Sequence, residues 1–215
     1  MGNISIAKMS LHNTGKIHGA LRRAEESSAK AVVLTSRLLT FSEGGEPLNE
    51  KNSLSKILKN LIDLHFRTAQ ALFHCSLDSG IWPVNGDENQ LSQLLYSVLH
   101  NAVQAIPDGT DGAREGTVTI HAENVSLTQP NEFSIAEGKY VKLSVIDNGI
   151  GIPADNLDKI FDPFYSTKDI YNRNGMGLGL SISRSIIRKH KGTIAVQSAE
   201  GEGTTVTMLI PAYIE

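Results

Sequence analysis

The sequence predicts an α+β fold, in which a two-layer α/β sandwich, a mixed sheet with helices on one face, follows a long helical hairpin segment. Near the amino terminus, small apolar residues recur at helical spacing. A stretch rich in glycine, proline and polar residues follows them, and short strand patterns then mix with amphipathic helices. Because strands and helices do not alternate strictly, we do not expect a doubly wound parallel sheet.

The composition is that of one globular domain with a smaller appendage. The 215 residues are 40% hydrophobic and 20% charged, with a formal net charge of -3. This excludes a disordered chain, and a weakly acidic chain gives no support for nucleic-acid binding. A single cysteine, Cys75, cannot form an internal disulfide. No segment approaches the ~18 consecutive apolar residues that span a bilayer. We therefore expect a cytoplasmic chain that makes no membrane contact itself, although the full-length protein could be membrane-attached.

Residues 14–42 predict one long helix. Thr14 is a suitable N-cap, and Gly44-Gly45 is a stop signal. At 1.5 Å per residue, ~29 residues give about 43 Å, which is too long to lie over a small domain. We expect this helix to pack against another helix or against its copy in a dimer; an ordinary core helix is the alternative. The small and apolar positions of its stripe are Ile17, Leu21, Ala24, Ser28, Ala31, Thr35 and Leu38.

A linker over 42–52 separates this appendage from a region with a different pattern. Alternating or apolar runs predict strands, and apolar residues three and four apart predict helices. The turn Asn85-Gly86-Asp87 ends one short strand, and Asp87 or Glu88 opens a helix. In chain order we expect a helix around 54–62, strands at 71–77 and 81–84, a helix to 106, strands at 117–127 and 140–146, a helix at 178–189, and strands at 193–196 and 204–210.

The helix that ends near 106 carries His100 and Asn101 on an otherwise apolar pattern. An amide oxygen on a helix can ligate Mg²⁺, which prefers oxygen ligands and commonly binds few protein groups together with phosphates. A satisfied or exposed polar residue is the ordinary interpretation of a lone asparagine. Asn101 alone therefore does not identify a metal site.

An apolar strand ends in the run Asp147-Asn148-Gly149-Ile150-Gly151. A carboxylate at a strand end can accept a hydrogen bond from an exocyclic amine such as that of adenine. Glycine permits positive φ and close backbone approach to a ligand. A tight Asp-Asn-Gly turn without a ligand explains the same residues equally well.

Alternate glycines occupy the run Gly175-Met176-Gly177-Leu178-Gly179, just before a predicted helix. Such a run leaves backbone N–H groups free to face phosphate oxygens, and the start of a helix adds a favourable dipole. It is not a Walker A loop, because no Gly-Lys-Ser/Thr follows. It is also a poor dinucleotide-binding fingerprint, because no strand precedes it.

Together and in this order, these runs resemble the catalytic and ATP-binding domain of sensor histidine kinases. That domain shares its fold with heat-shock chaperones, type II topoisomerase subunits and mismatch-repair ATPases. The resemblance covers roughly residues 50–215. Its motifs are the N box at His100-Asn101-Ala102, the G1 box at 147–151, the F box at 161–168, the G2 box at 175–180 and the closing motif at 201–205.

The resemblance implies the cofactors ATP and Mg²⁺ and a role for each matching position. Asn101 would hold the Mg²⁺, and Asp147 would bind the adenine amino group, helped by a water shared with Thr204 or Thr205. The stretch 166–175 would form a mobile lid, and Phe161 and Phe164 would pack its root or simply fill the core. The ATP-binding residues that it implies are Asn101, Asp147, Gly149, Gly151, Lys168, Gly175, Gly177, Leu178, Gly179, Thr204 and Thr205.

Two positions depart from the pattern. ATP-hydrolysing relatives place a glutamate four residues before the metal-binding asparagine, where this chain has Ser97. This argues against an ATPase machine and for phosphoryl transfer. Many kinases carry a lysine or arginine three residues after that asparagine, where this chain has Gln104, so that phosphate contact is not carried over from the family pattern.

No phosphoacceptor is evident, so no catalytic residue is assigned within the chain. In such kinases the acceptor histidine is usually followed by an acidic residue. No histidine of this chain has an acidic residue after it; the seven are His12, His18, His65, His74, His100, His121 and His190. The run from Gly2 to Ala7 resembles the segment just after an acceptor motif, and 38–42 resembles the end of the second hairpin helix. We therefore expect residues 1–44 to be part of a dimerisation and phosphoacceptor hairpin, 45–215 to be the catalytic domain, and the acceptor to lie upstream, with His12 or His18 as the lesser alternative.

The resulting prediction is a histidine kinase core that passes phosphate to a histidine and then to an aspartate of a response regulator receiver domain. We expect a homodimer formed through the hairpin. A nucleotide-binding or dimerisation module without autokinase activity is the alternative. An anti-sigma-type serine kinase would share the fold but would not need the helix at 14–42.

Overall fold

The computed structural model describes residues 19, 21–22, 24, 47–67, 69, 71–78, 80–107, 115–166 and 177–214. The chain divides into two compact units, Met1–Gly45 and Glu46–Glu215. In the first unit the four described residues are helical. The rest of the predicted hairpin, including His12 and His18, lies outside the described residues, and its role stays a prediction.

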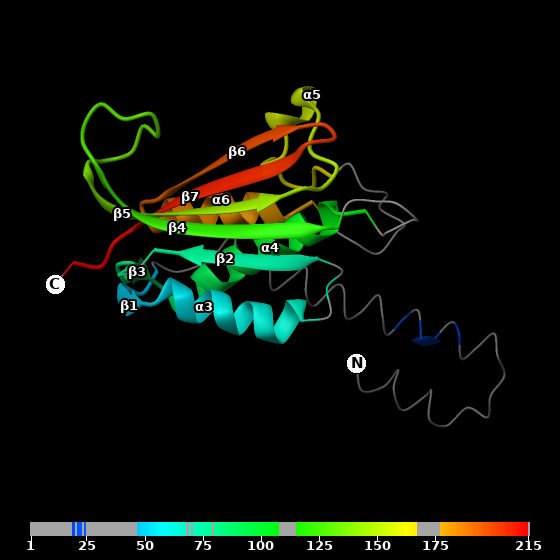
Figure 1. The fold of residues 1–215 in the computed structure, drawn as a ribbon, viewed down its shortest axis with the longest axis horizontal. Coiled ribbons are helices and arrows are strands. Elements are labelled where there is room, and N and C mark those ends of the chain that lie inside the picture. Colours follow the sequence, from blue (N-terminus) through cyan, green and yellow to red (C-terminus); the bar gives the residue numbers. More distant parts are fainter. Residues whose placement is uncertain are drawn as a thin grey trace. The chain divides into compact units, whose positions relative to one another are not determined.

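A five-stranded mixed sheet forms the centre of the second unit (Figure 1). Its strand order is β2-β4-β5-β7-β6, with β2 parallel to β4 and every other pair antiparallel. The strands are β2 (Leu72–Leu77), β4 (Thr117–Leu127), β5 (Gly138–Asp147), β6 (Thr193–Ala199) and β7 (Gly203–Pro211). The predicted mixed sheet is thereby confirmed.

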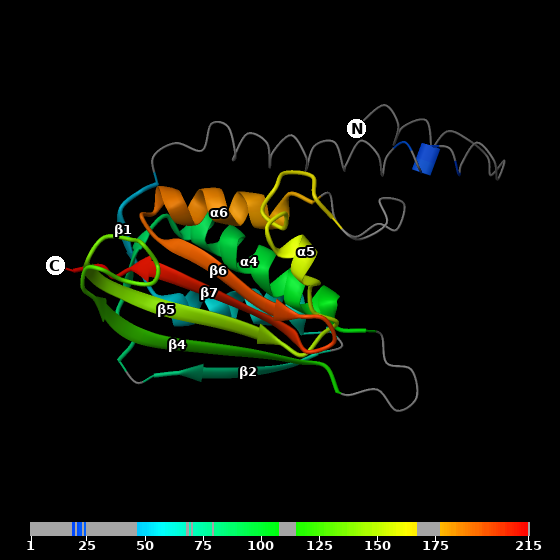
Figure 2. The same cartoon turned by 90° about the horizontal axis from the view of Figure 1, so that it is seen from above.

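The main helices cover one face of this sheet (Figure 2). The side chain of Ser53 caps the first of them, and that of Asp87 caps the second. They are α3 (Leu54–Leu61), which continues into the π-helical turn η1 (Ile62–Phe66), α4 (Glu88–Ala105) and α6 (Gly179–Lys189). This arrangement confirms the predicted two-layer sandwich with helices on one side.

The core lies between the sheet and the helices. Alternate residues of β4, β5 and β7 point toward the helices and are buried, as the period of two in a strand requires. On the helix side, the apolar stripe of α4 meets them. The fully buried large side chains include Leu91, Leu94, Leu95, Leu99, Ile120, Leu143, Met208 and Ile210.

Several elements differ from the sequence prediction, since η1 extends the predicted helix 54–62 and β6 runs past the predicted 193–196. The end of the predicted linker is β1 (Glu50–Asn52), which pairs antiparallel with β3 (Val84–Gly86). The predicted turn Asn85-Gly86 is thus part of β3, because it pairs with β1, and Asp87 is the N-cap of α4. The short helix α5 (Ala154–Leu157) was not predicted. It is one turn long, so it shows no apolar periodicity.

His190 joins the start of α4 to the end of α6. The backbone N–H of Asp87 donates to the His190 Nε2 at 3.0 Å, so Nδ1 carries the proton and donates to the Ile186 carbonyl oxygen at 2.9 Å. The ring is buried. It lies so close to Gly86 that a Cβ there would come within 2.8 Å of Nε2.

We expect His190→Ala to lower the free energy of unfolding by about 2–4 kcal/mol. The change leaves a buried N–H at the start of α4 without its acceptor and opens a cavity. Urea denaturation of the whole chain measures this. His74→Ala, at an exposed position of β2, serves as the matched control and should shift the midpoint little. Equal midpoints for the two variants would contradict this structural role.

Candidate nucleotide-binding site

Asp147 ends β5 on the side of the sheet that faces the helices. It pairs in register with Val118 of β4 and Thr204 of β7, so these three side chains share that face. The residue is 6% exposed. Its Oδ1 accepts a hydrogen bond from the Gly149 N–H at 2.9 Å. The site therefore contains a buried carboxylate whose orientation is fixed by the loop that follows it.

The loop after Asp147 packs directly on the carboxyl end of α4. The Ile150 N–H donates to the Ala105 carbonyl oxygen at 2.9 Å, and a Cβ at Gly149 would overlap that same carbonyl. Gly151 has φ +68°, and a Cβ there would overlap the Ala199 carbonyl oxygen. Only glycine combines this conformation with this approach. The glycines of this run thus let backbone pass where any side chain would collide.

Asn148 ties the same loop to the start of β4, a role that the sequence did not reveal. Its Oδ1 accepts from the Thr117 N–H at 2.8 Å, and its Nδ2 donates to the Glu115 carbonyl oxygen at 2.8 Å. The side-chain amide of Asn148 therefore extends the hydrogen bonding between β4 and β5 beyond the end of β5. An Asn-Gly pair predicts a turn, but it does not reveal a partner more than thirty residues away.

Thr204 faces Asp147 across the β5–β7 pair and is 8% exposed. Its hydroxyl lies 2.9 Å from the Ser198 Oγ. The Ser198 hydroxyl donates its single proton to the Gly203 carbonyl oxygen at 2.7 Å. The Thr204 hydroxyl is therefore the donor in its hydrogen bond with Ser198. The remaining lone pairs of its hydroxyl can accept from a water. Thr205 occupies the next position of the strand and lies on the opposite face, away from Asp147.

The amino end of α6 packs against α4 beside Asn101. A Cβ at Gly179 would lie 2.6 Å from the Ser97 Oγ and 3.8 Å from the Asn101 Nδ2. Asn101 stands one helical turn before Ala105, which contacts the loop after β5. The carboxyl end of α4 thus contacts both glycine-containing runs. Leu178 is buried, so its side chain belongs to the core.

Gly177 brings the F box next to the start of α6. It has φ +65°, and a Cβ there would lie 2.5 Å from the Phe164 carbonyl carbon and from the Tyr165 oxygen. Phe164 is 64% exposed, so it does not fill the core. Lys168 and Gly175, which the sequence assigns to the site, lie outside the described residues.

The residues brought together suit a nucleotide. The buried carboxylate of Asp147 can accept from an exocyclic amine, and the backbone N–H groups at the amino end of α6, which begins at Gly179, suit phosphates. Among the described residues, no group of three His, Cys, Asp or Glu side chains could hold a metal ion. A hard cation here would have the Asn101 amide and phosphate oxygens as ligands.

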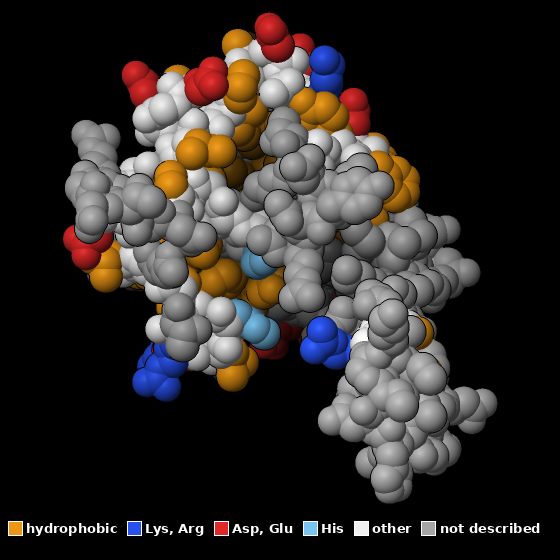
Figure 3. Space-filling view, turned by 90° about the vertical axis from the view of Figure 1, so that its right-hand side faces the viewer, with side chains coloured by type: hydrophobic (Ala, Val, Ile, Leu, Met, Phe, Trp, Pro, Cys, Tyr) orange, Lys and Arg blue, Asp and Glu red, His pale blue; other side chains and the backbone are white. Residues whose placement is uncertain are grey.

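All of these groups lie at one end of the second unit. In Figures 1 and 2, β5 and α4 finish at the same end, and α6 begins there. Figure 3 looks at this end and shows a hollow bordered by hydrophobic side chains, with histidines nearby. The chain therefore reaches the site at two further points, the end of the strand β5 and the start of the helix α6.

Comparison with known proteins identifies relatives of this region. The family model "Histidine kinase-, DNA gyrase B-, and HSP90-like ATPase" matches residues 86–214. "Sensor kinase CckA" of Brucella abortus is 33% identical over 196 residues, which are 89% of this chain and 20% of that protein. "Sensor protein FixL" of Bradyrhizobium diazoefficiens is 32% identical over 206 residues, 94% of this chain and 37% of that protein. The chain thus spans about a fifth to two fifths of these relatives.

Solved structures give the same fold. A nucleotide-free catalytic domain of histidine kinase ThkA has a TM-score of 0.58 at 27% identity, covering 76% of this chain and 95% of its own. Full-length ShkA in complex with AMPPNP has a TM-score of 0.72 at 21% identity, covering 95% of this chain and 41% of its own. In the part of this chain that the structure describes, no helix is both long and apolar enough to cross a membrane.

Proposed function

Because the chain belongs to the family of histidine kinase-, DNA gyrase B- and HSP90-like ATPases, we propose that it is the ATP-binding core of a histidine protein kinase. It binds Mg-ATP and transfers the γ-phosphoryl group to a histidine, from which an aspartate of a response regulator receives it. The observation that carries the proposal is the convergence of Asp147, Asn101 and Gly179 at the carboxyl end of α4.

Each residue has a defined task in this proposal. Asp147 accepts the exocyclic amine of adenine, and Thr204 accepts from a water that also contacts the base. Asn101 contributes its amide oxygen to Mg²⁺, which supplies positive charge that neutralises the phosphates when bound. Gly177 and Gly179 let the backbone approach the phosphates. The residues of the chain thus act by positioning and orientation, the usual mode of phosphoryl-transfer catalysis.

Ser97 supports transfer to another group over hydrolysis. It occupies the position where ATP-hydrolysing relatives carry a glutamate that orients water. Its hydroxyl faces Gly179, and a serine has no carboxylate to act as a base at this position. In this proposal the second unit holds the nucleotide, and the accepting histidine lies outside that unit.

The alternative is a nucleotide-binding or dimerisation module without autokinase activity. It is favoured by one observation: no histidine of the chain is followed by an acidic residue. The residues 1–44 are proposed to belong to a dimerisation hairpin in both cases. The two functions differ in whether phosphate ever leaves the nucleotide.

Incubation with γ-labelled ATP and Mg²⁺ distinguishes these functions. We expect the chain alone to acquire no phosphohistidine and to label a separately supplied acceptor hairpin, taken from the Brucella sensor kinase. Asp147→Asn is the control for dependence on the site. If nucleotide binds but no hairpin is labelled, the module function is the correct one. Strong label on His12 or His18 would contradict an acceptor outside the chain.

A further inference from the structure

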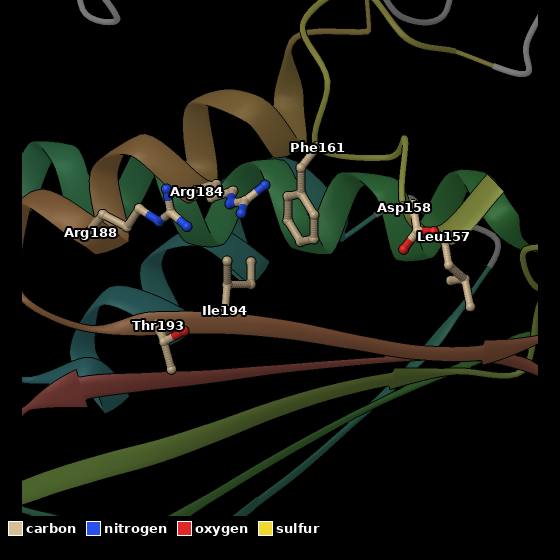
Figure 4. A pocket seen from close by; sticks show the side chains of 7 residues that line it. All are labelled: Leu157, Asp158, Phe161, Arg184, Arg188, Thr193 and Ile194. Atoms are coloured by element: carbon tan, nitrogen blue, oxygen red, sulfur yellow. The ribbon is translucent and has the colours of Figure 1, made fainter. Parts of the chain in front are cut away.

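A second cavity lies away from the nucleotide site, between α5, α6 and the edge strand β6. Its volume is about 320 Å³, which is at the lower end of the range for small-ligand sites. Three apolar side chains line part of it, namely Leu157, Phe161 and Ile194. Figure 4 shows Phe161 between the arginines of α6 and the pair Leu157 and Asp158 at the end of α5, with Ile194 on the strand below.

Two guanidinium groups line the opposite part of the cavity. Arg184 and Arg188 are four residues apart on α6, so they lie on the same face of this helix. The Arg184 guanidinium carbon lies 5.2 Å from the centre of the Phe161 ring. This cation–π contact does not use the N–H donors of the guanidinium for hydrogen bonds. The hydroxyl of Thr193 completes the polar lining.

In the part of the chain that the structure describes, neither guanidinium forms an ion pair with a carboxylate. Lys142, by contrast, pairs with Glu123 at 2.9 Å on the open face of the sheet. Asp158 lines the cavity but lies on the far side of Phe161 from the arginines (Figure 4). The lining thus carries two positive charges against one negative charge, in a chain whose net charge is -3.

The cavity is separate from the candidate nucleotide site. It uses the face of α6 that borders β6, whereas Gly179 meets α4. Neither Asp147 nor Asn101 lines it. A ligand in this cavity would not contact the residues assigned to ATP, and the inference does not depend on the proposed kinase function.

We propose that this cavity binds a small organic anion, in which a carboxylate or phosphate group is carried on a short apolar or aromatic body. The paired guanidiniums and Thr193 bind the oxyanion, because an arginine offers two parallel N–H donors that match such a group. Phe161 and Ile194 pack against the apolar body. Asp158 opposes the negative charge of the ligand and so limits its affinity.

Calorimetric titration of the whole chain with phenylphosphonate, benzoate and inorganic phosphate tests this. We expect phenylphosphonate and benzoate to bind, and inorganic phosphate to bind more weakly because it lacks the apolar body. Arg188→Gln, at an exposed position, should weaken phenylphosphonate binding about tenfold. Asp158→Asn should strengthen it. Lys159→Gln removes a nearby positive charge that does not line the cavity and should change the affinity less than twofold.

Amide NMR spectra locate the site, because the signals of Thr193 and Ile194 should shift with the ligand. An equal loss of phenylphosphonate affinity in Lys159→Gln and Arg188→Gln would show that only general charge attraction acts on the ligand. This result would overturn the proposal. The proposal would also be overturned if Asp147→Asn abolished binding of the probes and Arg188→Gln left it unchanged. That result would place the ligand at the nucleotide site. Absence of binding for all three probes would also overturn it.

Discussion

Asp147→Asn is expected to weaken ATP and ADP binding about tenfold or more. The buried carboxylate already accepts the Gly149 N–H at 2.9 Å, which fixes its orientation. An asparagine that keeps this bond through its oxygen would turn an NH₂ group toward the adenine amine, so two donors would face each other. A hydrogen bond to a charged group contributes about 1.5–3 kcal/mol, which corresponds to a range from about 10-fold to about 160-fold in affinity.

Calorimetric titration with ADP measures this change. Asp155→Asn is the matched control, because it removes the same charge from an exposed position in α5. We expect the control to bind as the parent does and both variants to unfold cooperatively. Parent-like affinity in Asp147→Asn would show that this carboxylate does not contact the base.

Gly151→Ala is expected to have the largest effect on stability, about 3 kcal/mol or more. The residue has φ +68°, a conformation that costs a residue with a Cβ about 1–2 kcal/mol. The new Cβ would also overlap the Ala199 carbonyl oxygen and lie 3.2 Å from the Glu200 Cα. Both neighbours are backbone, so a side-chain rotation cannot relieve the overlap. The loop after Asp147 would have to move, and nucleotide binding should fall with it.

Gly201→Ala separates conformational strain from collision. Gly201 has φ +81°, but a Cβ there would meet no atom within 4 Å. We expect Gly201→Ala to lower the free energy of unfolding by about 1 kcal/mol, because of the backbone conformation alone, and to leave the nucleotide affinity unchanged. Urea denaturation of both variants gives the difference. Equal losses of stability would show that close packing at Gly151 plays no part.

The elements with long periodic patterns were predictable from the sequence. The helix α4 begins after the capping residue Asp87, and β4 runs over 117–127 as its alternation indicates. The β1–β3 pair was not predictable from the sequence, because strands of three residues are too short to show a periodic pattern and gain their stability from tertiary pairing. The sequence therefore predicts a linker over the whole of 42–52, although its last three residues form β1.

Within the candidate site, residue types were easier to predict than geometry. The run that starts at Asp147 was visible as a carboxylate followed by glycines, but its partner was ambiguous between Thr204 and Thr205. Only the strand register separates these two, since neighbouring residues of a strand point to opposite faces. Ser198 and Asn148 could not be predicted at all, because their hydrogen bonds join segments that are distant in the sequence.

A crystal structure of the chain with Mg²⁺ and a non-hydrolysable ATP analogue is the most direct test of the central claim. We predict the adenine amine within hydrogen-bond distance of the Asp147 carboxylate, the cation on the Asn101 amide oxygen, and the phosphates beside Gly177 and Gly179. An analogue bound elsewhere, or bound with its base remote from Asp147, would contradict the proposed site.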